Sequence, residues 1–252
     1  MRGLPYSRLG PALFVHEMKA LFDTPDEISV ELERCAIDSV ENAFYTHWHP
    51  DHTGGMRIFE QLNMNWFSDK PKNTTTVYLP PKVQDDFKNK LGLMDHLNHL
   101  ARIGVVKIRI LQEAQRIEIN KIGIQCRQML DPSLYAYLLE EDDKRVLLAL
   151  DDTFRWVPPQ DLKGVDLVVL ETGWFERSPD GSTLFTKDSS IARSEASFEE
   201  TLAKIRGIGA ERTILTHIEE LVQRTFDDFK ELEAEYGDLR ITFAYDGLTV
   251  EV

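Results

Sequence analysis

The chain has 252 residues, 42% hydrophobic and 29% charged, a composition typical of globular proteins rather than disordered or fibrous ones. No run of apolar residues approaches the roughly 20 that a membrane-spanning helix needs, and the first residues lack the pattern of a secretory signal. The formal net charge of -14 argues against nucleic-acid binding, which depends on basic surfaces, but allows a small phosphate ester whose charge a metal offsets.

Runs rich in β-branched and aromatic residues predict a series of short strands along the chain. In chain order they are residues 12–16, 18–22, 43–46, 76–79, 105–111, 122–127, 134–139, 145–150, 165–170, 213–216, 240–244 and 248–252. Helical spacing predicts helices at residues 55–63, 81–91, 94–103, 197–208 and 225–236, with Ser197 as an N-cap. This order indicates two packed sheets flanked by helices.

Nothing in the sequence divides the chain, so we expect a single domain over residues 1–252. The two cysteines, Cys35 and Cys126, could pair, but so few cysteines favour reduced thiols and a cytoplasmic location. Residues 178–188 are rich in Ser, Pro, Gly and Asp and predict a long loop, either a lid over a substrate or a passive surface loop.

The segment Thr46-His47-Trp48-His49-Pro50-Asp51-His52 concentrates metal-competent side chains at a predicted strand-to-helix junction. His47 and His49 are two residues apart, so in an extended chain they share one face. Pro50 ends the strand, and Gly54-Gly55 allows a tight turn into the next helix. Imidazole and carboxylate ligands suit zinc, manganese or iron, and the cluster lacks the thiolates typical of closed structural zinc sites.

Two further candidates follow apolar runs at predicted strand ends. Asp151-Asp152-Thr153 comes after the apolar run 146–150, and a carboxylate there could bridge two metals. Without the histidine cluster elsewhere in the chain, the same Asp pair would be interpreted as a turn or an N-cap. His217 ends the run 213–216 and is interpreted as a metal ligand. His96 and His99, three apart on a predicted helix, are interpreted as a polar helix surface. Trp174 and Phe175 either line the pocket or pack in the core.

These residues resemble the HxHxDH motif of the metallo-β-lactamase superfamily, and the later Asp-Asp-Thr, Thr216-His217 and Tyr245-Asp246-Gly247 are similar to its phosphoribosyl cyclic phosphate phosphodiesterase branch. The resemblance runs through essentially the whole chain and implies a four-layer αββα sandwich of the α/β class. It also implies two bound divalent metal ions, for which zinc is preferred over manganese or iron. It further implies the ligands. His47 and His49 hold one metal, Asp51, His52 and His217 hold the other, and Asp152 bridges them.

The sequence departs from the family pattern in two places. The family has a further histidine about twenty residues before the bridging Asp, where this chain has Asp131; Asp131 is either a substitute ligand or a turn-starting residue before Pro132. The phosphodiesterase branch also has a histidine acid just before a Ser-x-Glu-Glu helix start. Here Glu195 takes that place, either as an exposed carboxylate or as a proton donor, which requires burial to raise its pKa.

The resemblance and the ligand set predict a metal-dependent hydrolase of a small phosphodiester, with a metal-bridging hydroxide as nucleophile that Asp51 steers. Three alternatives stay open: a hydrolase of a carboxylic ester, thioester or lactone, a nuclease acting on RNA ends, which the net charge disfavours, and a non-catalytic metal-binding module with a degraded first site. The expected partner is a small-molecule substrate, without nucleic acid or membrane, and the sequence is compatible with a homodimer.

Overall fold

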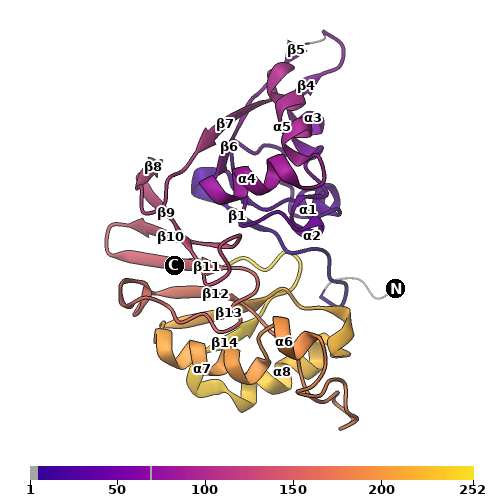
Figure 1. The fold of residues 1–252 in the computed structure, drawn as a ribbon, viewed down its shortest axis with the longest axis vertical. Helices are drawn as coiled ribbons and strands as arrows, with labels where there is room; N and C mark the ends of the chain where they lie inside the picture. The colour runs from indigo at the N-terminus through magenta and orange to yellow at the C-terminus, as the bar shows by residue number, and fades with distance from the viewer. Residues whose placement is uncertain (1–4, 69) are drawn as a thin grey trace. The chain divides into compact units, whose positions relative to one another are not determined.

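The computed structural model describes residues 5–68 and 70–252 (Figure 1). Residues 1–4 and residue 69 lie outside the described residues. The prediction that the first residues lack a secretory signal falls partly on residues 1–4. The chain falls into two compact units. One is Leu9–Tyr135, which we call the N-terminal unit; the other is Ala136–Val252 with residues 5–8, which we call the C-terminal unit. The prediction of a single domain stays a prediction.

The N-terminal unit is built on a five-stranded sheet with the order β1-β2-β3-β6-β7. Its strands are β1 (Leu13–Val15), β2 (Ala20–Phe22), β3 (Asn42–Phe44), β6 (Thr75–Leu79) and β7 (Val106–Ile110). β1 and β2 are antiparallel, and the other neighbours are parallel. The rings of Phe22, Phe44 and Tyr78 stack across three strands at centroid distances of 4.9 and 4.7 Å, which builds the core on one sheet face.

Helices and two hairpins complete this unit. They are η1 (His16–Met18), α1 (Ile28–Arg34), α2 (Pro50–Thr53), α3 (Ile58–Asn63), α4 (Pro81–Asn89), α5 (Leu93–Arg102), the hairpin β4 (Met64–Asn65) and β5 (Lys70–Pro71), and the hairpin β8 (Ile117–Ile119) and β9 (Ile122–Gln128). α5 contacts both α4 and β7. Its apolar residues recur at helical spacing and are buried, whereas His96 and His99 are exposed, as the sequence predicts.

The C-terminal unit has strands in the order β14-β13-β12-β11-β10. They are β10 (Tyr135–Glu141), β11 (Lys144–Ala149), β12 (Leu167–Glu171), β13 (Arg212–Thr216) and β14 (Ile241–Phe243). β10 and β11 are antiparallel, while β11 to β14 are parallel. The carboxyl ends of these four strands therefore lie at one sheet edge, where ligand sites of parallel sheets gather.

The helices of this unit are η2 (Gln160–Leu162), α6 (Ile191–Ser194), α7 (Phe198–Ile208), η3 (Glu220–Val222), α8 (Phe226–Glu235) and η4 (Gly237–Leu239) (Figure 1). The predicted N-cap Ser197 is confirmed: its hydroxyl accepts the N–H of Glu200, whose carboxylate in turn accepts the N–H of Ser197. α8 contacts β14, and the rings of Phe229 and Phe243 lie 4.4 Å apart.

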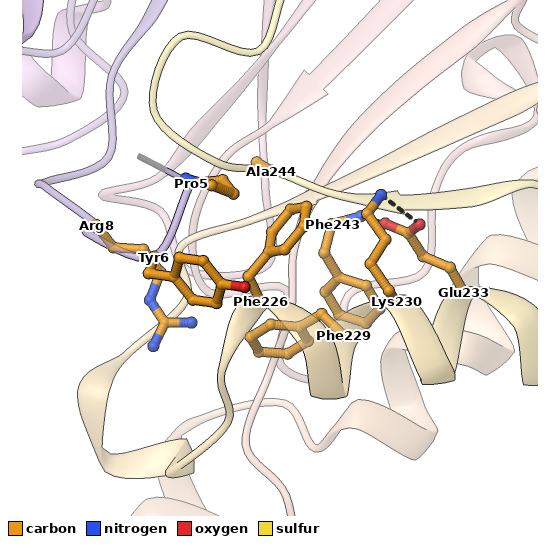
Figure 2. Close-up of a pocket in the computed structure, with 9 residues that line it drawn as sticks. All are labelled: Pro5, Tyr6, Arg8, Phe226, Phe229, Lys230, Glu233, Phe243 and Ala244. Carbon is orange, nitrogen blue, oxygen red and sulfur yellow. Dashed lines mark hydrogen bonds and ion pairs between the residues drawn. The ribbon is translucent and has the colours of Figure 1, made fainter. Parts of the chain in front are cut away.

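Pro5, Tyr6 and Arg8 line a small pocket with residues of α8, as Figure 2 shows. The Tyr6 hydroxyl donates to the Asp227 carboxylate at 3.1 Å, and its ring meets Phe226 edge to face. Arg8 donates to the carbonyl of Arg224 at 3.0 Å. This segment is thereby fixed on the last helix of the chain.

Most predicted strands and helices are present within a few residues, but the strand predicted at residues 248–252 is wrong. These residues are irregular, and both valines there are exposed, so the segment buries too little to form a strand. No helix among the described residues is long and apolar enough to cross a membrane.

Candidate metal centre

The histidine-rich segment leaves the sheet before its first ligand candidate. β3 ends at Phe44, residues 45–49 are irregular, and α2 begins at Pro50. Proline suits this first helical position because its fixed φ fits the helix and its missing N–H would have no partner there. Asp51 and His52 therefore project from a helical turn. The strand predicted at residues 43–46 ends two residues early, so irregular chain rather than a strand end carries His47 and His49.

Three imidazole rings gather in the N-terminal unit. The His47 ring lies 4.4 Å from that of His49 and 4.2 Å from that of His52, measured between centroids. His47 and His52 are buried, whereas His49 is exposed and the Asp51 side chain is half exposed. The cluster thus has a buried side held by the protein and an open side at His49 and Asp51.

A buried carboxylate, Asp23, fixes the proton positions on two of these rings. Its Oδ1 accepts the backbone N–H of Thr46 at 2.8 Å, and its Oδ2 accepts the Thr46 hydroxyl at 2.6 Å and lies 2.8 Å from His52 Nδ1. Since an ionised carboxylate only accepts hydrogen bonds, the His52 proton sits on Nδ1. Nε2 of the neutral ring then has a lone pair that can ligate a metal.

The same carboxylate acts on His47 through Thr46. The single hydroxyl proton of Thr46 points to Asp23, so its oxygen accepts from His47 Nδ1 at 3.0 Å. The His47 ring is therefore also protonated at Nδ1 and presents Nε2 for ligation. Sequence reasoning missed this role of Asp23. The available signal was an acidic residue directly after the apolar run 18–22.

Two glycines let α2 approach the loop that follows Asp23. A Cβ on Gly54 would lie 2.0 Å from the Asp26 carboxylate, and one on Gly55 would lie 2.1 Å from the backbone oxygen of Pro25. The Gly55 N–H donates to the carbonyl of Thr24, which closes this packing. Glycine is needed at both positions because a side chain would not fit. The backbone freedom expected from the sequence is not used at Gly54, whose φ of -60° is an ordinary helical angle.

The C-terminal unit presents its candidates at the carboxyl ends of β11 and β13, the strands on either side of β12. Asp151 is buried, and its Oδ1 lies 3.5 Å from Nε2 of His217. The neighbouring Asp152 uses its Oδ1 to accept the N–H of Phe154 at 3.0 Å. Asp151 is thus the carboxylate next to His217, whereas the sequence pointed to Asp152, whose bridging role stays a prediction.

The donor atoms fit divalent cations. Zinc bonds of about 2.0–2.2 Å at tetrahedral angles put neighbouring ligand atoms about 3.4 Å apart. In the N-terminal unit, His52 Nε2 and Asp51 Oδ2 are 3.4 Å apart, and in the C-terminal unit His217 Nε2 and Asp151 Oδ1 are 3.5 Å apart. His47, His49, Asp51, His52, Asp151 and His217 all offer a nitrogen or carboxylate oxygen suited to a metal ion.

Two glutamates of the C-terminal unit, the buried Glu171 and the partly buried Glu195, have raised pKa values. Burial raises the pKa of Glu171 to about 7, and the negative charge of Asp151 adds to the effect. Burial likewise raises the pKa of Glu195 to about 7, with further contributions from Asp152 and Asp151. Glu195 is only partly exposed, so it meets the condition of burial set by the sequence for a proton donor; its role stays a prediction.

The remaining sequence candidates have local structural contacts. Asp131 is exposed, and its Oδ1 accepts the N–H of Ser133 at 2.7 Å, the arrangement that the turn interpretation describes. Its proposed metal ligation stays a prediction. Trp174 and Phe175 are buried, as the core interpretation describes, and they also border a cavity of about 650 Å³ between residues 176–192, α7 and α8. The residues that line this cavity do not include the candidate metal ligands, so a place for the pair in the substrate pocket stays a prediction.

Comparison with known proteins places these features in a family. The model of the β-lactamase superfamily domain matches residues 21–218, which include all the motif residues except Tyr245-Asp246-Gly247. No curated protein sequence matches the chain.

Solved structures share the fold at low identity. A diphosphatase of the PhnP family is 17% identical with a TM-score of 0.61, covering 92% of this chain and 79% of its own. The short form of human tRNase Z is 14% identical with a TM-score of 0.65, covering 98% and 97%. Zn²⁺-bound PqqB from Methylobacterium extorquens is 14% identical with a TM-score of 0.64, covering 96% and 85%. The predicted α/β fold class is confirmed, and the chain belongs to the metallo-β-lactamase superfamily, whose members are mostly metal-dependent hydrolases.

Proposed function

We propose that the protein hydrolyses small phosphodiesters with two divalent metal ions held jointly by the histidine cluster and by the residues at the ends of β11 and β13. The observation that carries the proposal is the fixed protonation of His47 and His52, because Asp23 and Thr46 hold both rings with Nε2 available as a ligand.

The proposed ligand assignment follows the family pattern. His47 and His49 hold one metal, and Asp51, His52 and His217 hold the other. The Asp151–Asp152 pair supplies the bridging carboxylate, with Asp131 as a further ligand of the first metal. When bound, the cations would lower the pKa of a water molecule toward neutrality and neutralise charge on substrate oxygens.

The other site residues have roles that depend on their exposure. Asp51 is half exposed at the open side of the cluster, which allows its carboxylate to orient the attacking water. Glu195 is proposed to donate a proton to the leaving oxygen. Burial is the main cause of its raised pKa and does not depend on the Asp151 and Asp152 charges that bound metals would neutralise.

The proposed substrate class rests on the family branch and on charge. A diphosphatase of the PhnP family and a tRNase are among the proteins with the same fold. The net charge of -14 disfavours a polyanion such as RNA and favours a small ester whose charge the metals neutralise.

The test combines metal analysis with a substrate panel. We expect two tightly bound divalent metals per chain and a kcat/KM for bis(p-nitrophenyl) phosphate or a cyclic nucleotide well above that for a thioester or a lactone. His49→Ala and Asp152→Ala should each abolish turnover without unfolding the chain. Asp151→Asn, beside His217, should lose at least as much metal as Asp152→Asn.

His96→Ala is the matched control, because His96 is exposed on α5 and has no proposed ligand role. Turnover retained in purified His49→Ala, or one metal or none in the wild type, would contradict the proposal. Preferential cleavage of the thioester or lactone would identify the carboxylic-ester activity instead.

A further inference from the structure

The end of β12 lies between the two strands that carry the candidate ligands of the C-terminal unit. In the sheet, Leu170 pairs with Ala149 of β11, and Glu171 pairs with Thr216 of β13. Asp151 follows β11 by two residues, and His217 follows β13 directly. The last residues of β12 are therefore neighbours of both ligand-bearing segments.

Glu171 holds the segment after β11. Its side chain is buried, with 4% exposure, and its Oε1 accepts both the backbone N–H and the hydroxyl of Thr153, the latter at 2.7 Å. Thr153 is fully buried and directly follows Asp152, whose φ of +21° is a backbone angle that side chains rarely adopt. Such an angle persists when surrounding contacts fix it, and these two hydrogen bonds do so.

Thr172 holds the segment after β13 in the same manner. Its backbone N–H and its hydroxyl both donate to the carbonyl of Thr216, each at 2.8 Å. Thr216 directly precedes His217, which adopts a left-handed φ of +53°. Because the carbonyl of the preceding residue accepts these two hydrogen bonds, the backbone at His217 has little freedom to rotate.

We propose that Glu171 and Thr172 are positioning residues that set the spacing of Asp151, Asp152 and His217 before any metal binds. The inference rests on the proposed function, because it takes these three side chains to be metal ligands. In this arrangement the protein, rather than the cation, orders these three side chains, so metal binding requires little reorganisation of the chain.

The choice of variants follows from the surroundings. Burial lowers the pKa of Lys204, and the charge of Glu171 opposes this shift, so removing that carboxylate would leave a buried amine without its counter-charge and threaten folding. Thr153→Val and Thr172→Val instead remove one hydroxyl each and keep the side-chain shape. Thr213→Val is the matched control, because Thr213 is a buried β13 threonine whose hydroxyl has no hydrogen-bond partner among the described residues.

The experiment measures Mn²⁺ and Zn²⁺ affinity by calorimetry on full-length protein stripped with chelator, together with the Tm of the stripped protein. We expect Thr153→Val and Thr172→Val each to weaken metal affinity by about tenfold, the loss typical of one hydrogen bond. Thr213→Val should bind like the wild type, and Thr153→Ser and Thr172→Ser, which keep the hydroxyl, should restore affinity.

A purely structural role would lower the Tm of the stripped protein and leave metal affinity below that Tm unchanged, and this outcome would overturn the inference. Unchanged affinity in both valine variants would overturn it as well, while leaving the proposed function in place. A wild type that binds no metal would contradict both.

Discussion

At the residue scale, the ligand candidates and the residues that orient them differ in how far the sequence reveals them. His47, His49, Asp51 and His52 lie within six positions, so their chemistry is visible as a motif. Asp23 is more than twenty positions away and acts through Thr46, a contact that exists only after β2 and β3 pair. Local sequence patterns carry no information on such a contact.

Asp23 yields a direct prediction. In Asp23→Ala, the Thr46 N–H, its hydroxyl and the His52 Nδ1 proton lose a buried acceptor, so we expect a loss of about 2–4 kcal/mol in unfolding free energy. Metal affinity should fall roughly 10- to 100-fold, because the tautomers of two ligands are no longer fixed. Denaturant unfolding and metal calorimetry measure the two effects.

Asp38→Asn serves as the control for Asp23→Ala, since Asp38 is exposed in the same unit. Equal metal affinity in Asp23→Ala and Asp38→Asn would show that the proton positions are set in another way.

At the element scale, strands with long apolar runs and helices with clear caps are the ones that the sequence predicts. α1 was missed because its sequence Ile-Ser-Val-Glu-Leu-Glu-Arg mixes β-branched and charged residues, and only Ile28 and Leu32 are buried. β8 was missed because it has three residues and gains its place from pairing with β9. In both, tertiary contacts rather than local propensity decide the structure.

The glycines before α3 test the packing of the short helix α2. Gly55→Ala places a methyl group 2.1 Å from the Pro25 oxygen, which is backbone and cannot move aside, so we expect marked destabilisation and weaker metal binding. Gly207→Ala, inside α7 with open space around it, is the opposite case and should stabilise by about 0.5–1 kcal/mol. Thermal unfolding of both variants checks the pair; a Gly55→Ala protein as stable as the wild type would contradict the close approach.

The N-terminal cap of α8 predicts a pH dependence. Thr225 and Asp228 form a capping box, and the hydrogen bond from the Thr225 hydroxyl lowers the pKa of Asp228. A lowered folded-state pKa means that the contribution is complete above the unfolded pKa of about 3.9 and is lost as pH falls through the folded value. Asp228→Ala should therefore cost about 1 kcal/mol at pH 7 and much less near pH 2.

Denaturant unfolding at the two pH values checks this prediction, with Glu231→Ala, an exposed site on the same helix, as control. A penalty for Asp228→Ala that is equal at both pH values would rule out a role for the ionised cap.

At the scale of the whole molecule, the sequence predicts the fold class because the motif, the strand order and the capped helices agree with one another. The family match extends over residues 21–218 and so includes ligand candidates from both units. Which of Asp151 and Asp152 lies beside His217 was beyond the sequence, because adjacent residues differ only in which way the turn directs each carboxylate. That direction depends on the hydrogen bonds of Asp152 and Thr153.

The packing of residues 5–8 on α8 has a consequence for the order of folding. Tyr6 and Arg8 donate hydrogen bonds to Asp227 and Arg224, which lie 221 and 216 positions further along the chain. Contacts of such high sequence separation form late because closing a long loop costs chain entropy, so the C-terminal unit reaches its full set of contacts only at a late step. A bulky fusion placed directly before Tyr6 would compete for the surface of α8 at that late step.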